Sequence, residues 1–186
     1  GRGKKNVNMS LNRATDSTRQ PGSTFKVLST YAPAIDTMGY TLSTTIVDEP
    51  YRYSNGRPVN NWYSGYRGTV TVKKAIAQSM NVCAVKTLTE ITPQLGYEYL
   101  CNFGITTLVD KRVEKDGSVS SDINQPLALG GITDGVTNLE MTAAYATIAN
   151  KGTYTKPAFY SQVIDSNGRV ILDNTTPTTH TVLKKE

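Results

Sequence analysis

Ser23 and Lys26 are the two residues of this sequence whose types and spacing most directly suggest chemistry. On a helix, side chains three residues apart lie on the same face, so the hydroxyl and the amine can touch. Apolar residues surround Lys26 on nearly every side of the predicted helix, which indicates burial. Burial and the positive N-terminal end of the helix both lower the pKa of a lysine. The pair therefore predicts a serine nucleophile with a lysine as its general base.

A structural alternative exists for the same pair. Ser23 follows the turn-forming Pro21-Gly22 and could cap the helix, with Lys26 reaching to solvent. A Ser-x-x-Lys pattern is common by chance, so taken alone it favours this alternative. The catalytic hypothesis has one further attraction, because free N–H groups at a helix N-terminus stabilise the oxyanion that forms when Ser23 attacks a carbonyl.

A second polar group, Ser79-Met80-Asn81, lies at a predicted break between two helices. In a short loop, a hydroxyl and a carboxamide two residues apart can point in the same direction. The hydroxyl can relay a proton between an amine and a leaving group, and the carboxamide can hold a substrate peptide group. The alternative is again capping, with Ser79 or Asn81 starting the helix at Val82.

Scarce histidine and cysteine exclude several other kinds of site. The chain has one histidine, His180, and two cysteines, Cys83 and Cys101, so no cluster offers the roughly four ligands of a zinc site. A Ser-His-Asp or Cys-His catalyst would depend on His180 alone. We therefore expect no metal and no cofactor, and a Lys, Asp or Glu base. Both cysteines lie in apolar stretches typical of buried free thiols.

The composition indicates one domain, or a large part of one. The chain has 186 residues, 38% of them hydrophobic and 19% charged, with a net charge of +5. No run approaches the ~18 apolar residues of a membrane-spanning helix, and no signal-peptide pattern opens the chain, so a soluble piece is expected. The basic residues form scattered pairs without a nucleic-acid motif. They predict no nucleic-acid partner and suit an anionic setting such as a cell envelope.

The elements that must position the polar groups follow from hydrophobic spacing. Thr137 and Glu140 form a capping box for the clearest helix, and Asp165-Ser166-Asn167-Gly168 signals a hairpin. Residues 40–70 are expected to be irregular with short extended pieces, 110–126 to be a polar connection, and the Thr-rich end to be weakly ordered. Helices are predicted from Ser23 to a bend or end near Pro33, from Val70 to the break at Ser79, and over 82–91, 94–104 and 138–151.

These motifs together resemble the transpeptidase domain of penicillin-binding proteins, in the penicillin-binding and serine β-lactamase superfamily. The resemblance is closest to the bifunctional class A type, and it agrees in order and spacing over about residues 10–172. Beyond the two Ser motifs, it includes Arg19-Gln20-Pro21-Gly22, Asn61-Trp62, Gly68-Thr69-Val70-Thr71, Ala75-Ile76-Ala77-Gln78, Leu127-Ala128-Leu129-Gly130-Gly131 and Gly135-Val136-Thr137-Asn138-Leu139-Glu140-Met141.

The resemblance implies a D,D-transpeptidase that cross-links peptidoglycan stem peptides through an acyl-serine and is acylated by β-lactam antibiotics. Ser23 would be the nucleophile, Lys26 its base and Ser79 the proton shuttle, while Asn81 would hold the amide of the substrate or antibiotic. The oxyanion hole would use the Ser23 N–H and a second N–H from a strand. The setting implied is the bacterial cell envelope outside the cytoplasm, with a membrane anchor and an upstream glycosyltransferase domain in the parent protein.

The sequence departs from the family at the third motif, because it contains no Lys-Thr-Gly or Lys-Ser-Gly, and only 22 residues precede Ser23. We therefore expect residues 1–186 to be a partial transpeptidase domain of α+β class. It would hold mostly the helical lobe and a β-hairpin of a β-lactamase/transpeptidase-like fold, with much of the central antiparallel sheet missing. Since one oxyanion donor is worth ~10²–10³ in rate, weak or absent activity is expected of this chain alone.

Two alternative functions share the same motifs. A serine β-lactamase or D,D-carboxypeptidase must deliver water to the acyl-enzyme, and only Glu98 with Asn102 matches the spacing of a Glu-x-x-x-Asn water-activating element; we interpret that match as chance. The other alternative is a non-catalytic domain that binds cell-wall peptides or β-lactams. Turnover, stable acylation and no acylation distinguish the three. Trp62 and Tyr66 are weaker candidates for lining the substrate groove.

Overall fold

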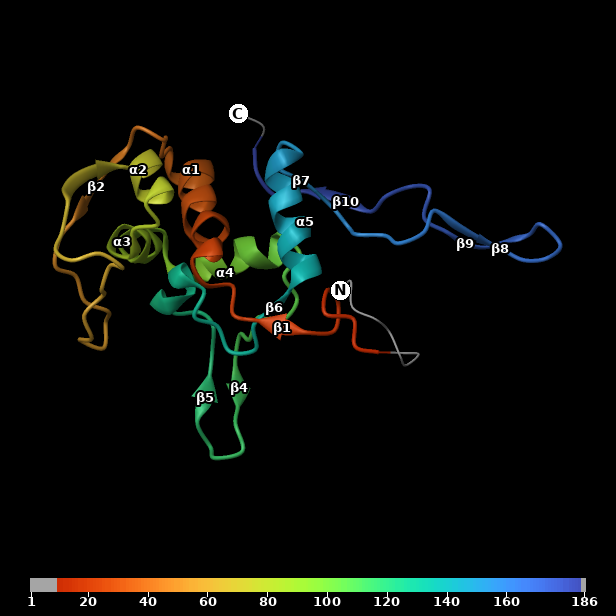
Figure 1. Ribbon diagram of the computed structural model, residues 1–186, viewed down its shortest axis with the longest axis horizontal. Coiled ribbons are helices and arrows are strands. Elements are labelled where there is room, and N and C mark those ends of the chain that lie inside the picture. The colour runs from red at the N-terminus through yellow and green to blue at the C-terminus, as the bar shows by residue number, and fades with distance from the viewer. Residues whose placement is uncertain (1–9, 185–186) are drawn as a thin grey trace.

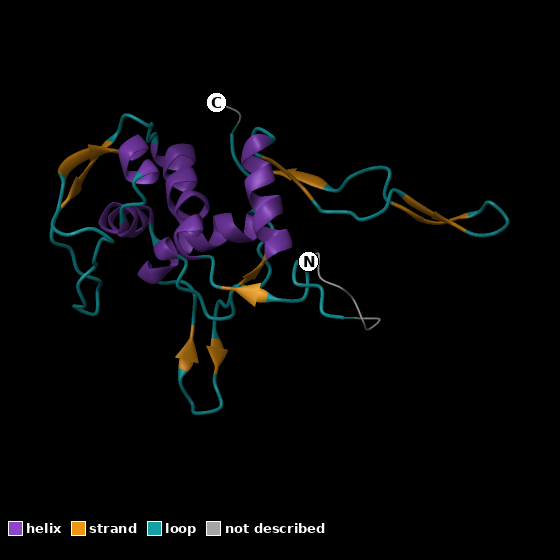
Figure 2. Cartoon of the chain, in the orientation of Figure 1, coloured by secondary structure: helices purple, strands orange, loops and turns teal. Residues whose placement is uncertain are grey.

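The computed structural model describes residues 10–184, which form a group of helices with short strand pairs around it (Figure 1, Figure 2). No helix in this range is long and apolar enough to cross a lipid bilayer. The helical segments are η1 (Gly22–Thr24), η2 (Lys26–Tyr31), α1 (Ala32–Met38), α2 (Val72–Ala77), α3 (Asn81–Ile91), α4 (Pro93–Asn102), η3 (Gln125–Leu129) and α5 (Asn138–Ala149).

The strands of the described residues pair only two at a time, and every pair is antiparallel. This confirms an α+β chain dominated by its helical lobe, although it has more strand pairs than the one predicted hairpin. The pairs are β1 (Thr18–Arg19) with β6 (Val136–Thr137), β2 (Thr45–Asp48) with β3 (Gly68–Thr71), β4 (Arg112–Val113) with β5 (Val119–Ser120), β7 (Thr153–Thr155) with β10 (Thr179–Thr181), and β8 (Gln162–Ile164) with β9 (Val170–Asp173).

Helix α3 lies at the centre of the core. Four consecutive residues at its N-terminal end, Val82 to Val85, are fully buried, so this end of the helix is covered on all sides. The helix contacts η2, η3, α1, α4 and β2. Gly96 of α4 allows that helix to approach η2 closely, because a Cβ at this position would lie 2.6 Å from the Ser29 carbonyl oxygen. The core therefore holds both α3 and α4 against η2.

The first helical stretch differs from the regular helix that we predicted. It begins as the 3₁₀ turn η1, widens into the π-helix η2 and becomes the α-helix α1, which runs past Pro33 to Met38. In η2 the Ala32 N–H donates to the Val27 oxygen, but Pro33 has no N–H with which to continue this five-residue pattern. The helical stretch therefore changes type just before Pro33 and does not end there. Single π-turns inside helices are frequent at functional sites.

Two surface predictions are confirmed. Thr137 and Glu140 form the predicted capping box of α5. Strands β8 and β9 flank the predicted turn at 165–168, where Gly168 N–H donates to the Asp165 oxygen. This hairpin projects far from the helices (Figure 1). It exposes apolar side chains on both strands, namely Val163, Ile164, Val170, Ile171 and Leu172.

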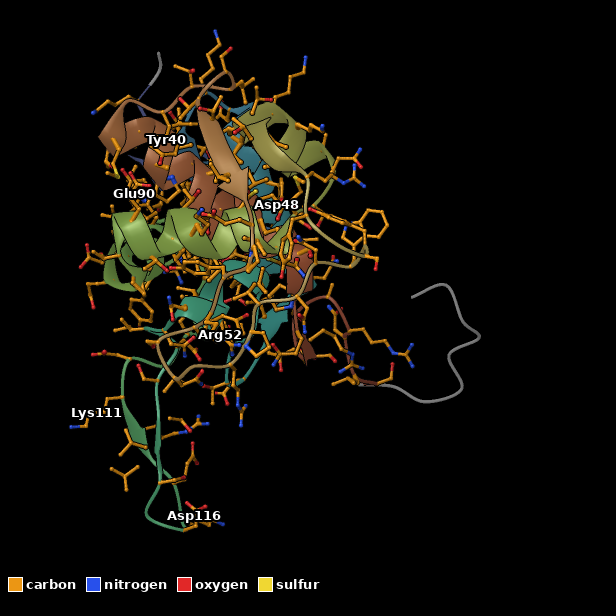
Figure 3. All side chains as sticks on the ribbon, turned by 90° about the vertical axis from the view of Figure 1, so that its left-hand side faces the viewer. Tyr40, Asp48, Arg52, Glu90, Lys111 and Asp116 are labelled. Carbon is orange, nitrogen blue, oxygen red and sulfur yellow. The ribbon has the colours of Figure 1, made fainter. Side chains whose placement is uncertain are left out.

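Three other predictions are corrected. The Thr-rich end is ordered as β10, because its strand edge pairs with β7. Cys83 is a buried free thiol as expected, but the free Cys101 is exposed because it lies on the outer face of α4. The polar connection at 110–126 contains the β4–β5 hairpin, whose Lys111 and Asp116 extend from the body (Figure 3).

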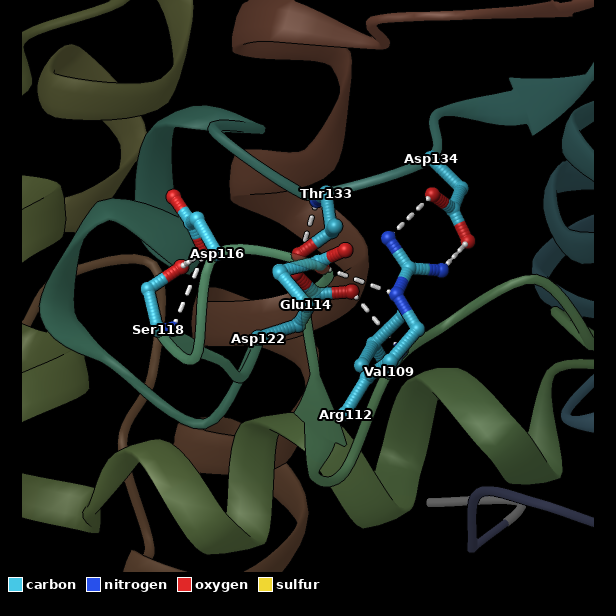
Figure 4. A network of polar contacts seen from close by, with 8 residues as sticks. All are labelled: Val109, Arg112, Glu114, Asp116, Ser118, Asp122, Thr133 and Asp134. Atoms are coloured by element: carbon cyan, nitrogen blue, oxygen red, sulfur yellow. Dashed lines mark hydrogen bonds and ion pairs between the residues drawn. The ribbon is translucent and has the colours of Figure 1, made fainter.

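The β4–β5 hairpin is anchored by charged side chains at its base (Figure 4). Arg112 pairs with Asp134 at 2.7 Å and with Glu114 at 2.9 Å. The buried Asp122 accepts hydrogen bonds from the Val109 N–H and from the Thr133 N–H and hydroxyl. These contacts join the hairpin to the segment that leads into β6.

Candidate active site

Lys26 lies at the start of η2 with only 3% of its surface exposed, as its apolar surroundings predict. Its Nζ donates to the backbone oxygen of Ser79 at 2.6 Å, to Ser79 Oγ at 2.9 Å and to Asn81 Oδ1 at 2.6 Å. The structure thus brings Lys26 together with both polar residues of the Ser79-Met80-Asn81 motif. Helix η2, which begins at Lys26, and helix α3, which begins at Asn81, pack against each other in the core.

Burial lowers the pKa of Lys26 to about 8, in the direction that the sequence predicts. The three oxygen acceptors act in the opposite direction, because they favour the charged form of the amine. At pH 7 and a pKa of about 8, roughly one tenth of the molecules carry a neutral amine. The lysine is therefore able to serve as a base near neutral pH.

Ser23 lies in η1 with its side chain exposed. Its hydroxyl makes no hydrogen bond with any other described residue, so the predicted contact with Lys26 is not a hydrogen bond in this structure. The reason is local: Ser23 belongs to a 3₁₀ turn and Lys26 opens a π-helix, so the regular α-helical spacing behind the prediction does not hold.

The turn that carries Ser23 is held on both sides. Gly130 packs against Gly22 so closely that a Cβ on Gly130 would lie 2.3 Å from the Gly22 oxygen. On the other side, the Tyr145 hydroxyl donates to the Thr24 oxygen at 2.7 Å. The Gln20 carboxamide binds both backbone polar groups of Ile132. The exposed hydroxyl thus sits on a fixed backbone.

Ser79 has a strained backbone. Its φ of +50° lies in the left-handed region, which a residue other than glycine rarely adopts. Strain of this kind gathers at functional sites. Here it lets the chain turn sharply between α2 and α3, so that the backbone oxygen and the hydroxyl of Ser79 both face Lys26.

Neither Ser79 nor Asn81 caps α3, contrary to the structural alternative. Asn61 does so instead: its Oδ1 accepts hydrogen bonds from the N–H groups of Asn81 at 2.9 Å and Val82 at 3.1 Å. The Asn61 Nδ2 donates to Asp48 Oδ1 at 2.8 Å. The hydrogen bond of Asp48 to Asn61 has no signal in the sequence, because Asp48 lies in a segment predicted to be irregular.

The weaker candidates occupy different places. Trp62 is 65% exposed, and its Nε1 donates to the Gln78 oxygen next to Ser79, so it lies beside the motif. Tyr66 is exposed and makes no side-chain hydrogen bond among the described residues. His180 packs on the ring of Tyr154, and its Nε2 lies 2.7 Å from the Asn102 oxygen. Its ring is therefore engaged with these two residues.

Comparison with known protein families identifies the chain. The penicillin binding protein transpeptidase domain model matches residues 2–186. The chain belongs to this family. The predicted resemblance to penicillin-binding proteins is confirmed over nearly the whole sequence, and the transpeptidase-like fold with it.

The relatives of this transpeptidase domain include class A penicillin-binding proteins. Penicillin-binding protein 1A of Clostridium tetani (strain Massachusetts / E88) is 36% identical over 181 residues, which cover 94% of this chain and 22% of the relative. Penicillin-binding protein 1F of Bacillus subtilis (strain 168) is 38% identical over 172 residues, covering 92% and 22%. The chain thus spans about a fifth of the length of these relatives.

Solved structures agree with this transpeptidase assignment. PonA1 of Mycobacterium tuberculosis in complex with penicillin V has a TM-score of 0.78 and 25% identity, over 95% of this chain and 46% of that chain. Penicillin-binding protein 1A of Haemophilus influenzae has a TM-score of 0.70 and 27% identity, over 91% and 24%.

Proposed function

We propose that this chain is part of a D,D-transpeptidase that cross-links peptidoglycan stem peptides through an acyl-serine intermediate and is acylated by β-lactams. The observation that carries the proposal is the buried Lys26 amine, which is bound to Ser79 and Asn81 and belongs to a residue three positions after the exposed Ser23. The family match and the penicillin V complex of PonA1 support it.

The proposed reaction has two acyl-transfer steps. Ser23 Oγ attacks the carbonyl carbon of the donor peptide and gives its proton to Lys26. As the new O–C bond forms and the C–N bond breaks, the proton passes through Ser79 Oγ to the departing amine. The amine of an acceptor stem peptide then attacks the acyl-serine and releases Ser23, whose oxygen regains a proton along the same route.

The contacts of Lys26 support a relay role for Ser79. A neutral amine has two protons, and two of its neighbours, the Ser79 backbone oxygen and Asn81 Oδ1, can only accept. The third neighbour, the Ser79 hydroxyl at 2.9 Å, is the one of the three that can also donate. Once Lys26 has taken the proton of Ser23 and is charged, its hydrogen bond to Ser79 Oγ gives that proton a route to the leaving group.

Asn81 keeps one group free for a ligand. Its Oδ1 accepts from Lys26, and one Nδ2 proton goes to the Asn60 oxygen at 2.8 Å. The second Nδ2 proton remains available. We propose that it donates to the amide carbonyl of the stem peptide or the β-lactam.

The remaining parts of the proposal concern the setting. Activity at the outer side of the bacterial cytoplasmic membrane agrees with the penicillin-binding proteins among the relatives. A membrane anchor, an upstream glycosyltransferase domain and weak activity of this chain alone remain predictions.

The intact mass of the chain after incubation with penicillin V tests the proposed function. We expect one penicilloyl group that persists for hours. An adduct that appears and decays would indicate a β-lactamase or carboxypeptidase, although Glu98 argues against this because it is exposed and bound to Gln94. If no adduct forms, the full-length parent is tested next, and a parent that also forms no adduct would contradict the proposal.

The acylation rate is also expected to rise with pH. Lys26 must be neutral to act as a base, and its pKa is lowered to about 8. The rate should increase roughly tenfold per pH unit up to pH 7 and reach a plateau above about pH 8 to 9. Pre-steady-state acylation by penicillin V between pH 6 and 9.5 measures this profile, and a flat rate from pH 6 to 8 would exclude Lys26 as the base.

A further inference from the structure

We propose that Asp48 and Asn61 are positioning residues of the acyl-transfer site: Asn61 caps α3 from a distant loop, which leaves Ser79 and Asn81 free to bind Lys26, and Asp48 sets the orientation of Asn61. This inference rests on the proposed function. It concerns residues that contact neither the nucleophile nor its base.

The first step is the unusual cap of α3. The first N–H groups of a helix need acceptors, which a Ser, Thr, Asp or Asn at the N-cap usually supplies. The N-cap of α3 is Met80, whose side chain makes no capping hydrogen bond. Asn61 supplies the acceptor instead, with one oxygen bound to the N–H groups of Asn81 and Val82.

The second step is what this cap makes possible. Ser79 and Asn81 are of the residue types that favour helix starts, and a local cap would engage one of their side chains. Because Asn61 takes that role, Ser79 Oγ and Asn81 Oδ1 both reach the Lys26 amine, at 2.9 Å and 2.6 Å. Asn61 therefore caps the helix, while the side chains of Ser79 and Asn81 bind the amine.

The third step is the orientation of the Asn61 carboxamide. Asp48 lies at the end of β2 (Figure 3). Its Oδ1 accepts from Asn61 Nδ2, and its Oδ2 accepts from the Tyr63 hydroxyl at 2.7 Å and the Arg67 N–H at 2.9 Å. A carboxylate offers only acceptors, so the amide end of Asn61 must face Asp48. Its oxygen must then face α3.

The burial of Asp48 is the fourth step. The residue is 1% exposed and belongs to none of the ion pairs found among residues 10–184. A buried carboxylate without a cation is costly and is kept only where its hydrogen bonds matter. Asp48 accepts three hydrogen bonds with its two oxygens. An asparagine at this position has only one oxygen, so it could not accept all three in the same geometry.

A charge-swapped pair of variants tests the proposal. Asp48→Asn sets an amide against the Asn61 amide, and Asn61→Asp sets two carboxylates against each other. In the double variant the new amide at position 48 donates to the new carboxylate at position 61. That carboxylate still accepts from Asn81 and Val82, and every hydrogen bond of the network is restored.

We expect each single variant to lose about 10- to 100-fold in the rate of acylation by penicillin V, and the double variant to recover most of it. Ile105→Val, a buried change outside the network, controls for lost stability and should keep its rate. Unfolding in urea gives the stability loss of each variant. Singles that acylate as fast as the wild type, or a double variant that stays as slow as the singles, would overturn the proposal.

A second measurement does not depend on acylation. Amide hydrogen exchange should show loss of protection at Asn81 and Val82 in each single variant and its return in the double variant, with Leu88 of the same helix unchanged. If neither the wild-type chain nor its full-length parent forms an adduct, the proposed function fails and the exchange pattern alone decides the positioning role. Unchanged protection at Asn81 and Val82 in the single variants would then overturn it.

Discussion

No penicilloyl adduct is expected on the Ser23→Ala variant after incubation with penicillin V, because the acyl bond can form only at the hydroxyl that this change removes. Ser23 is the exposed serine of η1, on a turn held by Gly130 and Tyr145. Alanine fits this turn without a clash, and the Ser23 hydroxyl has no hydrogen-bonding partner to lose among the described residues. The fold should therefore remain unchanged while acylation disappears.

Intact mass spectrometry measures the result, and peptide mapping of the wild-type adduct locates the modified residue. Ser64→Ala is the matched control, since Ser64 is also exposed but lies outside the site, and it should acylate as the wild type does. An adduct that persists in Ser23→Ala would show that another residue is the nucleophile. Ser79 would be the first to consider, because it contacts Lys26 directly.

The sequence predicted the parts of the site that depend on local pattern. The apolar residues around Lys26 indicated its burial and its lowered pKa, and both are found. The polar break at Ser79-Met80-Asn81 separated two helices as expected, and the capping box at Thr137 set the start of α5. Such features depend on neighbours within a few residues, which a single sequence displays.

The contact between Ser23 and Lys26 could not be predicted in the same way. A 3₁₀ turn, an α-helix and a π-helix have similar apolar patterns over a few residues, yet they place side chains three apart in different directions. The structure combines all three types between Gly22 and Met38. Only the absence of an N–H at Pro33 signalled the irregularity.

Long-range and turn-based features account for the other differences. Asn61 caps a helix twenty residues away, and the buried Asp48 lies in a segment rich in turn formers, so neither role follows from spacing. The β4–β5 hairpin did have a local signal in Asp116-Gly117, a dipeptide favoured in tight hairpins, and Gly117 adopts a φ of +82°. The pairing of β10 with β7 joins segments more than twenty residues apart and has no comparable signal.

Lys26→Met is expected to reduce the rate of acylation by ~10²–10⁴ without unfolding the chain, because it removes a general base and keeps an unbranched apolar stem. Ser23 and Ser79 both remain in this variant, so the loss would measure the contribution of the amine. Time-resolved intact mass with penicillin V gives the rate. Lys73→Met, an exposed lysine on α2, is the control and should leave the rate unchanged; a Lys26→Met variant that acylates normally would exclude the proposed base.

The same substitution should change how stability depends on pH. The pKa of Lys26 falls from its ordinary 10.5 to about 8 on folding, so between these values the unfolded chain binds more protons than the folded chain. The free energy of unfolding of the wild type therefore gains a contribution that rises with pH across this window, by at most about 3 kcal/mol. Below about pH 8 the penalty for charging the buried amine is fully present.

Lys26→Met lacks this contribution. Urea unfolding at pH 8 and pH 10 measures the difference in the free energy of unfolding between wild type and variant, and this difference should favour the wild type more at pH 10. Tyrosines ionise in both chains and cancel in that difference, and a difference that stays constant would contradict the lowered pKa of Lys26.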